Sequence, residues 1–375
     1  MVDYIKELKK RFKVATDLET RERYSKDYGF ISPKLSKFRK IADAVVWLYS
    51  EEEIKEFFKI QQDYHFYIVE RGNGTNTLGG AMPIKEKSVI VIPEMKKFEV
   101  LNGKLISDPS VEFNDLDVSS LPVYPTSFNM ATIGGFVAGG SLGIGSLKYG
   151  AVWDNVNMIK VVNQKGEYTF YDNDVKKVVQ SAGTVGIITK IGFRLIKRDK
   201  IVVKNYKFKK VGDAINKALD LIDEAEFISI RSKEMAYNIS NENWDNWNLI
   251  VGFPGEDGKP VTSADIITTF AGAYFTVVNK KKVSYYSVDV KIEDLEKLDK
   301  IKGMIDCELA RSQGKLFSHT YFLGFSEIPL QNEKVFNLHS YKINDRVEED
   351  RLKKIIDFKK VVDPEDYINP GKIEY

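Results

Sequence analysis

The stretch PTSFNMATIGGFVAGGSLGIGSLKYG at residues 125–150 differs sharply in composition from the rest of the chain. It holds seven of the 26 glycines, and Lys148 is its only charged residue, although 29% of the 375 residues are charged. Each glycine inside a helix or strand costs roughly 0.5–1 kcal/mol relative to alanine. So many glycines in a neutral segment predict backbone that lies against a large flat ligand.

Two shorter glycine segments lie on either side of this stretch. The loop RGNGTNTLGG at 71–80 follows a predicted strand, and the turn SAGTVGIIT occupies 181–189. Glycines let successive backbone N–H groups point at one anion, and Thr75, Asn76 and Thr77 add side-chain donors. The loop at 71–80 is neither a Walker loop nor the dinucleotide fingerprint, because Thr77 stands where the third glycine belongs. It predicts phosphate binding, with an ordinary hairpin loop as the alternative.

The overall composition excludes several classes of protein. Lysine plus arginine number 56 and aspartate plus glutamate 54, so a nucleic-acid binder that acts through its net charge is not expected. The single cysteine, Cys307, excludes an internal disulfide and a cysteine-ligated zinc or iron–sulfur centre. The three histidines (His65, His319 and His339) lie far apart and show no ligand spacing. No metal site is therefore predicted.

The longest charge-free run, residues 118–147, is long enough to cross a bilayer. It contains Pro122, Pro125 and six glycines, which favour a buried loop over a membrane helix, so no transmembrane segment is predicted. The start MVDYIKELKKRF lacks the apolar core of a signal peptide. We expect a cytoplasmic protein, and a peripheral membrane position through a partner remains open.

Strand and helix signals alternate along the chain and predict an α+β fold. In the first 196 residues we expect helices at 4–12, after the N-cap Ser50 and at 175–180. The strands expected there lie at 66–70, 88–93, 159–163, 167–171 and 186–196, with a hairpin at Asn102-Gly103. Between 202 and 292 strand-like runs predict an antiparallel sheet with helices at 211–224 and 260–271. Further helices are expected at 293–305 and 346–360.

Taken together, five segments in order resemble the FAD-binding domain of the vanillyl-alcohol oxidase (PCMH-type) superfamily, in its glycolate oxidase/D-lactate dehydrogenase branch. The segments are ADAVVWLYSEEEIKEF, RGNGTNTLGG, ATIGGFVAGG with SLKYG, VVNQKGE and AGTVGIITKI, and the tail DPEDYINPGK also matches. The resemblance covers about residues 45–195 and 345–373. It implies a two-subdomain FAD-binding domain at 1–196, a smaller α+β substrate (cap) domain with an antiparallel sheet at 197–345, and a C-terminal segment at 346–375 that returns to the FAD domain.

The resemblance also implies which residues hold the cofactor. The first loop is expected to bind the FAD pyrophosphate mainly through its backbone, the central glycine stretch to follow the rest of the cofactor, and Ile188 to touch the adenine end. The tail near Asn369 and Lys372 is expected close to the flavin ring. No histidine lies in either glycine segment, so noncovalent FAD is predicted, with His65 at a strand end. The predicted cofactor-binding residues are Arg71, Gly72, Asn73, Gly74, Thr75, Asn76, Pro125, Thr126, Thr132, Gly134, Gly135, Gly139, Ser141, Ile188 and Asn369.

Departures from the family pattern concern the substrate. Members often carry an acidic residue where Ala182 stands and an asparagine where Phe136 stands. The metal-dependent dehydrogenases of the branch have a histidine pair, whereas LFSHTYFLGF offers only His319. His319 and Tyr321 are the candidate base or donor. The candidate cations for a substrate carboxylate are Arg231, Arg311, Lys315 and Arg346, of which Arg311 is predicted as catalytic. Trp244 and Trp247 either cap the flavin or pack in the core.

These observations predict an FAD-dependent oxidoreductase that oxidises a small 2-hydroxyacid or related alcohol by hydride transfer to flavin N5. One alternative is a non-catalytic or electron-relaying FAD subunit of a redox complex. Another is a binding protein that kept the fold without FAD. Because the chain has no iron–sulfur ligands, an iron–sulfur or other electron-acceptor subunit remains open as a partner, and so does a homo-oligomer.

Overall fold

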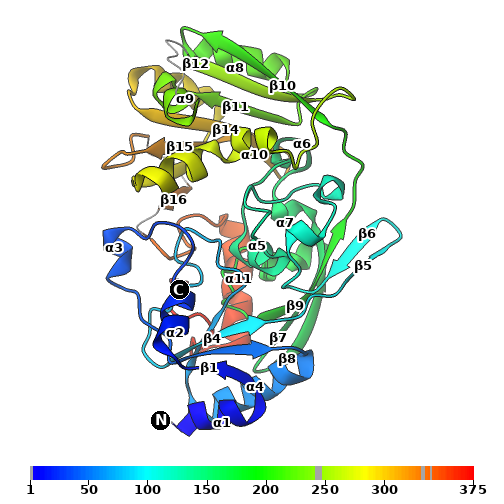
Figure 1. Ribbon diagram of the computed structural model, residues 1–375, viewed down its shortest axis with the longest axis vertical. Coiled ribbons are helices and arrows are strands. Elements are labelled where there is room, and N and C mark those ends of the chain that lie inside the picture. The colour runs from blue at the N-terminus through cyan, green and yellow to red at the C-terminus, as the bar shows by residue number, and fades with distance from the viewer. Residues whose placement is uncertain (1–2, 241–246, 331–333, 338–339) are drawn as a thin grey trace.

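A computed structural model of the chain describes residues 3–240, 247–330, 334–337 and 340–375. Its strands form three sheets of four, seven and five strands. Figure 1 shows the seven-stranded sheet at one end of the long axis and the other two sheets at the opposite end. The glycine-rich stretch lies between them as the short helices α5 (Ile133–Gly139), α6 (Ser146–Tyr149) and α7 (Val152–Asn155). The predicted α+β fold with an antiparallel sheet is confirmed.

The four-stranded sheet carries the first glycine loop. Its order is β1 (Lys13–Ala15), β2 (Ala44–Leu48), β4 (Ser88–Pro93) and β3 (Tyr67–Glu70), with β1 antiparallel and the others parallel. All of β4 is buried, because it is an inner strand and α1 (Asp3–Arg11) and α4 (Glu51–Tyr64) pack into the same core. As predicted, Ser50 caps α4 by accepting from the Glu53 N–H at 3.2 Å. Two short helices, α2 (Leu18–Tyr24) and α3 (Pro33–Ser36), complete this region.

The five-stranded sheet is antiparallel throughout. Its order is β5 (Phe98–Leu101), β6 (Lys104–Ser107), β9 (Ile187–Arg194), β7 (Val156–Asn163) and β8 (Gly166–Tyr171). The predicted hairpin turn at Asn102 and Gly103 is confirmed, with φ of 51° and 71°. The helix expected at 175–180 is instead a 3-10 helix over Asp172–Lys177. Residues 178–180 form a turn that leads into the third glycine segment.

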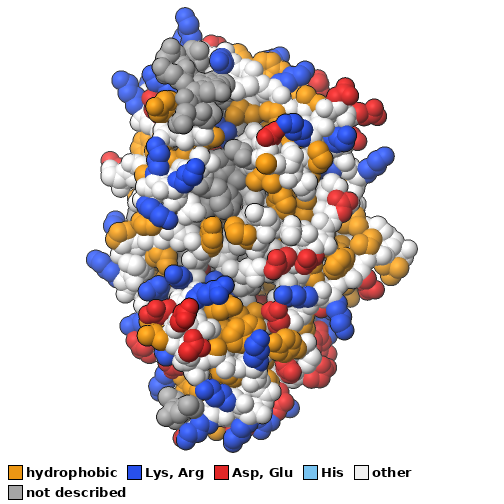
Figure 2. Space-filling view, viewed as in Figure 1, with side chains coloured by type: hydrophobic (Ala, Val, Ile, Leu, Met, Phe, Trp, Pro, Cys, Tyr) orange, Lys and Arg blue, Asp and Glu red, His pale blue; other side chains and the backbone are white. Residues whose placement is uncertain are grey.

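The face of the molecule in Figure 2 mixes positive and negative side chains, as the balanced charge total predicts. Apolar side chains also reach solvent where the β5–β6 hairpin projects, with Phe98 45% and Leu101 61% exposed. No helix among the described residues is long and apolar enough to cross a membrane.

The seven-stranded sheet contains the second half of the chain. Its order is β10 (Ile201–Phe208), β12 (Trp247–Pro254), β11 (Phe227–Arg231), β14 (Met304–Ser312), β15 (Lys315–Leu323), β13 (Tyr285–Val290) and β16 (Val335–Asn337), all antiparallel. One face packs against α8 (Val211–Asp220) and the 3-10 helix Ile292–Lys300. The helices α9 (Lys233–Ser240) and α10 (Ala264–Ala271), followed by a π-helix over Gly272–Asn279, complete this part.

The helix expected at 293–305 is wrong at its C-terminal end. The 3-10 helix ends at Lys300, and β14 begins at Met304. Gly303 separates the two with a φ of 147°, a conformation that a helix does not contain. Ile305 and Cys307 therefore share one face of a strand and pack into the core around α8.

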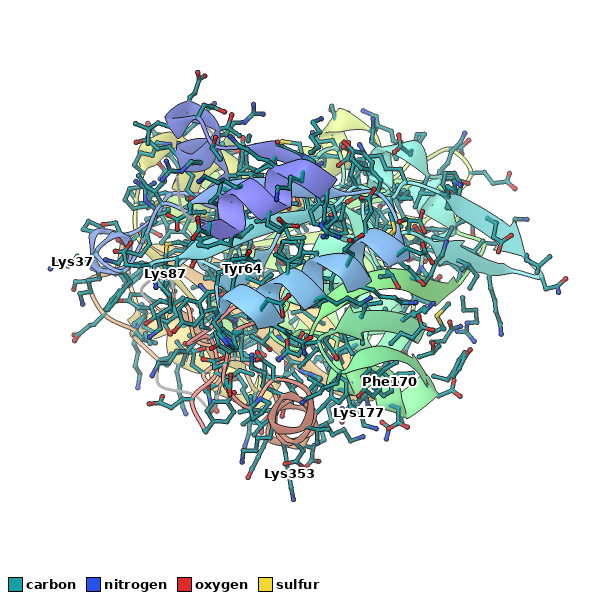
Figure 3. The ribbon with its side chains drawn as sticks, turned by 90° about the horizontal axis from the view of Figure 1, so that it is seen from below. Lys37, Tyr64, Lys87, Phe170, Lys177 and Lys353 are labelled. Carbon is teal, nitrogen blue, oxygen red and sulfur yellow. The ribbon has the colours of Figure 1, made fainter. Side chains whose placement is uncertain are left out.

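The C-terminal segment packs against the first two sheets. Helix α11 (Glu349–Val362) packs against the five-stranded sheet, where the ring centroids of Phe358 and Phe170 are 5.1 Å apart. Figure 3 views α11 end-on, with Lys353 pointing away from the sheet and Lys177 beside Phe170. After the helix, Ile368 forms a parallel bridge with Ile68 of β3. The division into domains at 1–196, 197–345 and 346–375 remains a proposal. The four- and five-stranded sheets lie before residue 197, and the seven-stranded sheet lies after it.

Candidate functional site

Close backbone approaches account for the glycines of the central stretch. The Gly134 N–H donates to the Pro109 carbonyl at 2.8 Å, and a Cβ on Gly134 would lie 2.7 Å from the Pro109 Cβ. A Cβ on Gly143 would lie 2.2 Å from the Tyr124 carbonyl oxygen. The Thr132 hydroxyl caps α5 by accepting from the Gly135 N–H at 3.2 Å. The stretch thus folds onto neighbouring backbone and leaves its other side open.

Two adjoining cavities lie on that open side. The smaller, about 70 Å³, lies between the loop after β3, α5 and the turn at Ala182 and Gly183. The larger, about 260 Å³, lies between the glycine stretch and one face of the seven-stranded sheet. Thr75, Asn76, Gly135 and Gly139 line both cavities. The two are therefore parts of one trough that runs from the phosphate-type loop to the sheet.

Most of the residues predicted to bind the cofactor line this trough. The smaller cavity has Arg71, Gly72, Asn73, Gly74, Thr132 and Gly134 together with the four shared residues. The larger has Pro125, Thr126 and Ser141 in addition. Ile188 and Asn369 line neither cavity.

The backbone of Ile188 and the side chain of Asn369 are occupied by protein partners. The Ile188 N–H donates to the Glu70 carboxyl at 3.1 Å. The Asn369 amide donates to the carbonyls of Gly80 and Ala182, so it ties the first glycine loop to the third segment. Both residues therefore support the walls of the trough in this structure instead of forming its surface.

Arg71 serves the loop in a way that the sequence did not indicate. Its guanidinium is buried and donates to the carbonyls of Tyr24 at 3.2 Å and Lys26 at 2.7 Å. It also lies over the Tyr24 ring, 5.4 Å from the centroid. Burial lowers the pKa of Arg71. The side chain thus fastens the glycine loop to the segment after α2.

The C-terminal tail supports the same loop from outside the trough. The Lys372 ammonium is buried and donates to the carbonyls of Gly79 at 2.6 Å and Met82 at 2.9 Å. Burial lowers the pKa of Lys372 to about 7. Asp27, whose pKa burial raises, accepts from the Ala81 N–H at 3.2 Å. Lys372 lines neither cavity, so the structure places it behind the loop and not on its ligand side.

Two rows of polar side chains lie on one face of the seven-stranded sheet, and all of their members except Asp289 and Asp306 line the larger cavity. The strand registers align Ser229, Glu308, His319 and Asp289 in one row, and Arg231, Asp306, Tyr321 and Ser287 in the next. Alternate residues of a strand share a face, so both rows point away from the core around α8. Four strands that are distant in sequence therefore contribute to one polar surface.

His319 lies at the centre of this surface. Its Nδ1 is 2.7 Å from Asp289 Oδ1, and the Tyr321 ring contacts its ring edge-on at 4.9 Å. With Asp289 as the acceptor, a neutral His319 ring carries its proton on Nδ1 and has Nε2 as its proton acceptor. Burial and the Glu308 carboxyl raise the pKa of Tyr321 well above its usual value, so Tyr321 keeps its proton. Burial, aided by Asp306, raises the pKa of Glu308 to about 8.

Two of the four candidate cations line the larger cavity. Arg231 is ion-paired with Asp306 at 3.1 Å. Arg346 donates to the Lys342 carbonyl at 2.8 Å and lies 3.6 Å from the Asp345 carboxyl.

Arg311 does not line the cavity, although it was predicted as catalytic. Its guanidinium donates to the Leu147 carbonyl at 3.1 Å and lies 3.5 Å from Asp223. The preceding residue, Ala310, lines the cavity, and the alternation of β14 turns the next side chain aside. Lys315 is exposed at the start of β15 and is also outside the cavity.

The other residues singled out in the sequence lie in varied surroundings. Trp247 packs against the core on the α8 side of the sheet and not over the trough, whereas Trp244 lies outside the described residues. Phe136 lines the larger cavity and Ala182 the smaller one. His65 ends α4 in a left-handed conformation, exposed beside Tyr367. Among the described residues, no group of three or more His, Cys, Asp or Glu side chains is arranged to hold a metal ion.

Sequence reasoning missed Glu70, Asp289, Glu308 and Tyr285. Glu70 is the last residue of β3, immediately before the predicted loop, so its position was a usable signal. The other three come from strands whose pairing no local pattern reveals. Tyr285 connects the two parts of the protein, because its hydroxyl is 2.9 Å from the Thr77 hydroxyl of the glycine loop.

The trough fits an extended cofactor that combines a diphosphate with a flat ring system. Its walls are largely glycine backbone, and a Cβ on Gly72 would meet the Thr132 hydroxyl at 2.3 Å. One buried oxygen on the wall, Glu70 Oε2, has no hydrogen-bond partner among the described residues. The fold and the site are therefore those of a protein that binds an extended dinucleotide cofactor.

Comparison with known proteins identifies the domain. Residues 42–170 match the protein family described as FAD binding domain. This match to an FAD binding domain identifies FAD as the cofactor.

Two curated relatives are similar in sequence. D-lactate dehydrogenase from Archaeoglobus fulgidus is 26% identical over 284 residues, which are 68% of this chain and 61% of the relative. Glycolate oxidase subunit GlcD from Bacillus subtilis is 28% identical over 179 residues, which are 43% of this chain and 38% of the relative. The match thus spans less than two thirds of either relative.

The fold extends over the whole chain in solved structures. A structure of alkyldihydroxyacetonephosphate synthase superposes with a TM-score of 0.72 at 17% identity, covering 99% of this chain and 85% of that one. The seven-stranded part therefore also belongs to the shared fold.

Proposed function

We propose that the protein is an FAD-dependent oxidoreductase that oxidises a small 2-hydroxyacid or a related alcohol. The observation that carries the proposal is the His319–Asp289 pair on the sheet face, which opens on the same cavity as the glycine stretch. The names of the curated relatives, a D-lactate dehydrogenase and a glycolate oxidase subunit, agree with this substrate class.

The cofactor residues support noncovalent FAD held in the trough. The loop Gly72–Asn76 would face the diphosphate, and the stretch from Pro125 to Ser141 would face the flavin half. Among the described residues, His319 is the only histidine that lines either cavity, and no cysteine does. When bound, FAD supplies a flavin ring that accepts a hydride.

In this proposal His319 acts as the general base. Asp289 Oδ1 lies 2.7 Å from His319 Nδ1 and orients the ring. The same carboxylate would stabilise the imidazolium that forms when Nε2 takes the proton of a substrate hydroxyl. Tyr321, protonated and adjacent, can donate a hydrogen bond to the same substrate oxygen.

Arg346 is the better of the two cations for a substrate carboxylate. Arg231 is already neutralised by Asp306 at 3.1 Å, whereas the Asp345 carboxyl oxygen is 3.6 Å from Arg346. A buried guanidinium that a carboxylate holds only loosely gains most from an anionic ligand. The pKa of Glu308, about 8, leaves that residue largely uncharged at neutral pH, so it does not repel the anion.

Anaerobic mixing with a panel of 2-hydroxyacids tests the proposal. We expect at least one to bleach the flavin absorbance, and His319→Gln to slow the bleaching roughly 10²–10⁴-fold with unchanged FAD content. The matched control is His65→Gln, which changes an exposed histidine outside the trough and should bleach at the normal rate.

The outcomes separate this proposal from its alternatives. Bound flavin that none of the hydroxyacids bleaches would favour a relay subunit, with an electron-acceptor subunit such as an iron–sulfur protein as its partner. Purified protein without flavin absorbance that also fails to take up added FAD would indicate a binding protein. Bleaching of His319→Gln at the normal rate would remove His319 from the mechanism.

A further inference from the structure

Glu70 is a buried acid at the narrow end of the trough that the catalytic proposal does not use. It is the last residue of β3 and lines the smaller cavity together with the glycine loop that follows it. One carboxyl oxygen, Oε1, accepts from the Ile188 N–H at 3.1 Å. The other, Oε2, is buried and has no hydrogen-bond partner among the described residues.

A ligand in the smaller cavity could supply the missing hydrogen-bond partner of Oε2. On one side lies Gly183, with a φ of 67°, where a Cβ would come within 2.9 Å of Oε2. A side chain at that position would cover the oxygen, so the glycine keeps it uncovered. A buried polar atom without a partner costs about 1–3 kcal/mol, which a ligand in the cavity would recover.

We infer that Glu70 binds the adenosine diphosphate half of FAD as a neutral carboxylic acid, so that binding of FAD is coupled to uptake of a proton. In this state Oε1 still accepts from Ile188, and the hydroxyl at Oε2 donates to the ligand. The acceptor is a diphosphate oxygen or a ring nitrogen of adenine. An ionised carboxylate would instead repel a diphosphate held by the same loop.

The electrostatics of the site agree with a neutral acid. Burial raises the pKa of Glu70 to about 8, and only the Ile188 hydrogen bond opposes that shift. Three other charged groups lie around the loop. Arg71 also lines the smaller cavity, with its guanidinium donating to the carbonyls of Tyr24 and Lys26, whereas Asp27 and Lys372 lie on the outer side of the loop.

This inference depends on FAD binding but not on the identity of the substrate. The test is the dissociation constant of FAD for the full-length chain, measured between pH 6.5 and 9 by fluorescence quenching after removal of the bound flavin. With a pKa of about 8 in the free protein, we expect the dissociation constant to rise about tenfold from pH 7 to pH 9. The rate of FAD release from the holoprotein at the two pH values is a second readout that needs no stripped protein.

Two variants distinguish titration of Glu70 from other causes of the pH dependence of FAD affinity. Glu70→Gln reproduces the neutral acid, with its carbonyl facing Ile188 and its amide facing the ligand, so its affinity should stay constant from pH 7 to pH 9. Glu112→Gln is the control, because it removes a half-buried carboxylate that accepts from Asn73 of the same loop at 2.9 Å. That variant should keep the tenfold change.

Three results would overturn the inference. The first is a wild-type affinity that does not change with pH. The second is a Glu70→Gln variant that keeps the change, which would assign it to Lys372 or Asp27. The third is an absence of FAD binding at every pH, which would also contradict FAD as the cofactor. If no hydroxyacid bleaches the flavin, only the proposed substrate is contradicted, and the inference about Glu70 stands. Competition by pyrophosphate and by adenosine identifies the acceptor, since only the fragment that Glu70 contacts should show the pH dependence.

Discussion

Gly74 offers a direct test of how the phosphate-type loop is held. Its φ is 70°, and a Cβ on it would lie 1.9 Å from Arg71 Nη2 and 2.1 Å from Arg71 Cζ. Gly74→Ala therefore forces a buried guanidinium to move. That movement breaks its hydrogen bonds to the carbonyls of Tyr24 and Lys26.

The expected loss is the sum of a backbone contribution and a contact contribution. An L-residue at positive φ costs about 1–2 kcal/mol. Each hydrogen bond of a charged group is worth about 1.5–3 kcal/mol. With both hydrogen bonds broken, we therefore expect Gly74→Ala to lower the free energy of unfolding by about 4–8 kcal/mol, and to reduce FAD retention because the loop is displaced.

Gly103→Ala is the matched control. Gly103 has nearly the same φ, 71°, but it lies on the β5–β6 hairpin, where an added Cβ would have nothing within 4 Å. It should lose only the backbone contribution of about 1–2 kcal/mol. Urea unfolding of both variants without FAD gives the comparison, and FAD content gives the second readout. Equal losses in the two variants would show that the Arg71 guanidinium relocates freely and does not fasten the loop.

Two further predictions concern buried titratable groups. Because the pKa of Lys372 is about 7 in the folded protein, the unfolded chain binds one more proton between pH 7 and pH 10. The free energy of unfolding should therefore rise with pH across that window by up to about 1.4 kcal/mol per unit, relative to Lys372→Met, in urea titrations at each pH. An identical slope in the variant would contradict the burial of this ammonium. Burial also raises the pKa of Cys307 to about 12, so a thiol reagent at pH 8 should modify it only after unfolding, and rapid labelling of the native protein would contradict its placement in β14.

Most of the residues that line the trough could be predicted from the sequence, because their signals are local. Close backbone approach requires glycine at particular positions such as Gly134, and an N-cap such as Ser50 acts on the residues that directly follow it. The neutral charge of residues 125–150 likewise reflects one extended surface, the wall of the trough. Each of these features can be seen within a window of a few residues.

The contacts of a side chain could not be predicted where they depend on distant neighbours. Arg71 lines the smaller cavity, but its guanidinium also donates to two carbonyls that lie more than 40 residues earlier in the chain. Arg311 and Arg346 looked equivalent as charges, and only the alternation of β14 and the return of the C-terminal segment placed one of them in the cavity.

The sequence by itself determined which glycine-rich segments line the trough and their order along the chain. It also excluded a cysteine-ligated zinc or iron–sulfur centre, because Cys307 is its only cysteine. Tertiary structure decided which groups face the substrate cavity. The row Glu308, His319 and Asp289 exists only because β14, β15 and β13 pair in one register, and a shift of one residue would turn His319 to the opposite face. Register is set by the packing of the whole sheet against α8, and burial is the largest cause of the shifted pKa values of Glu70 and Lys372, so neither can be read from the residues that adjoin them in the sequence.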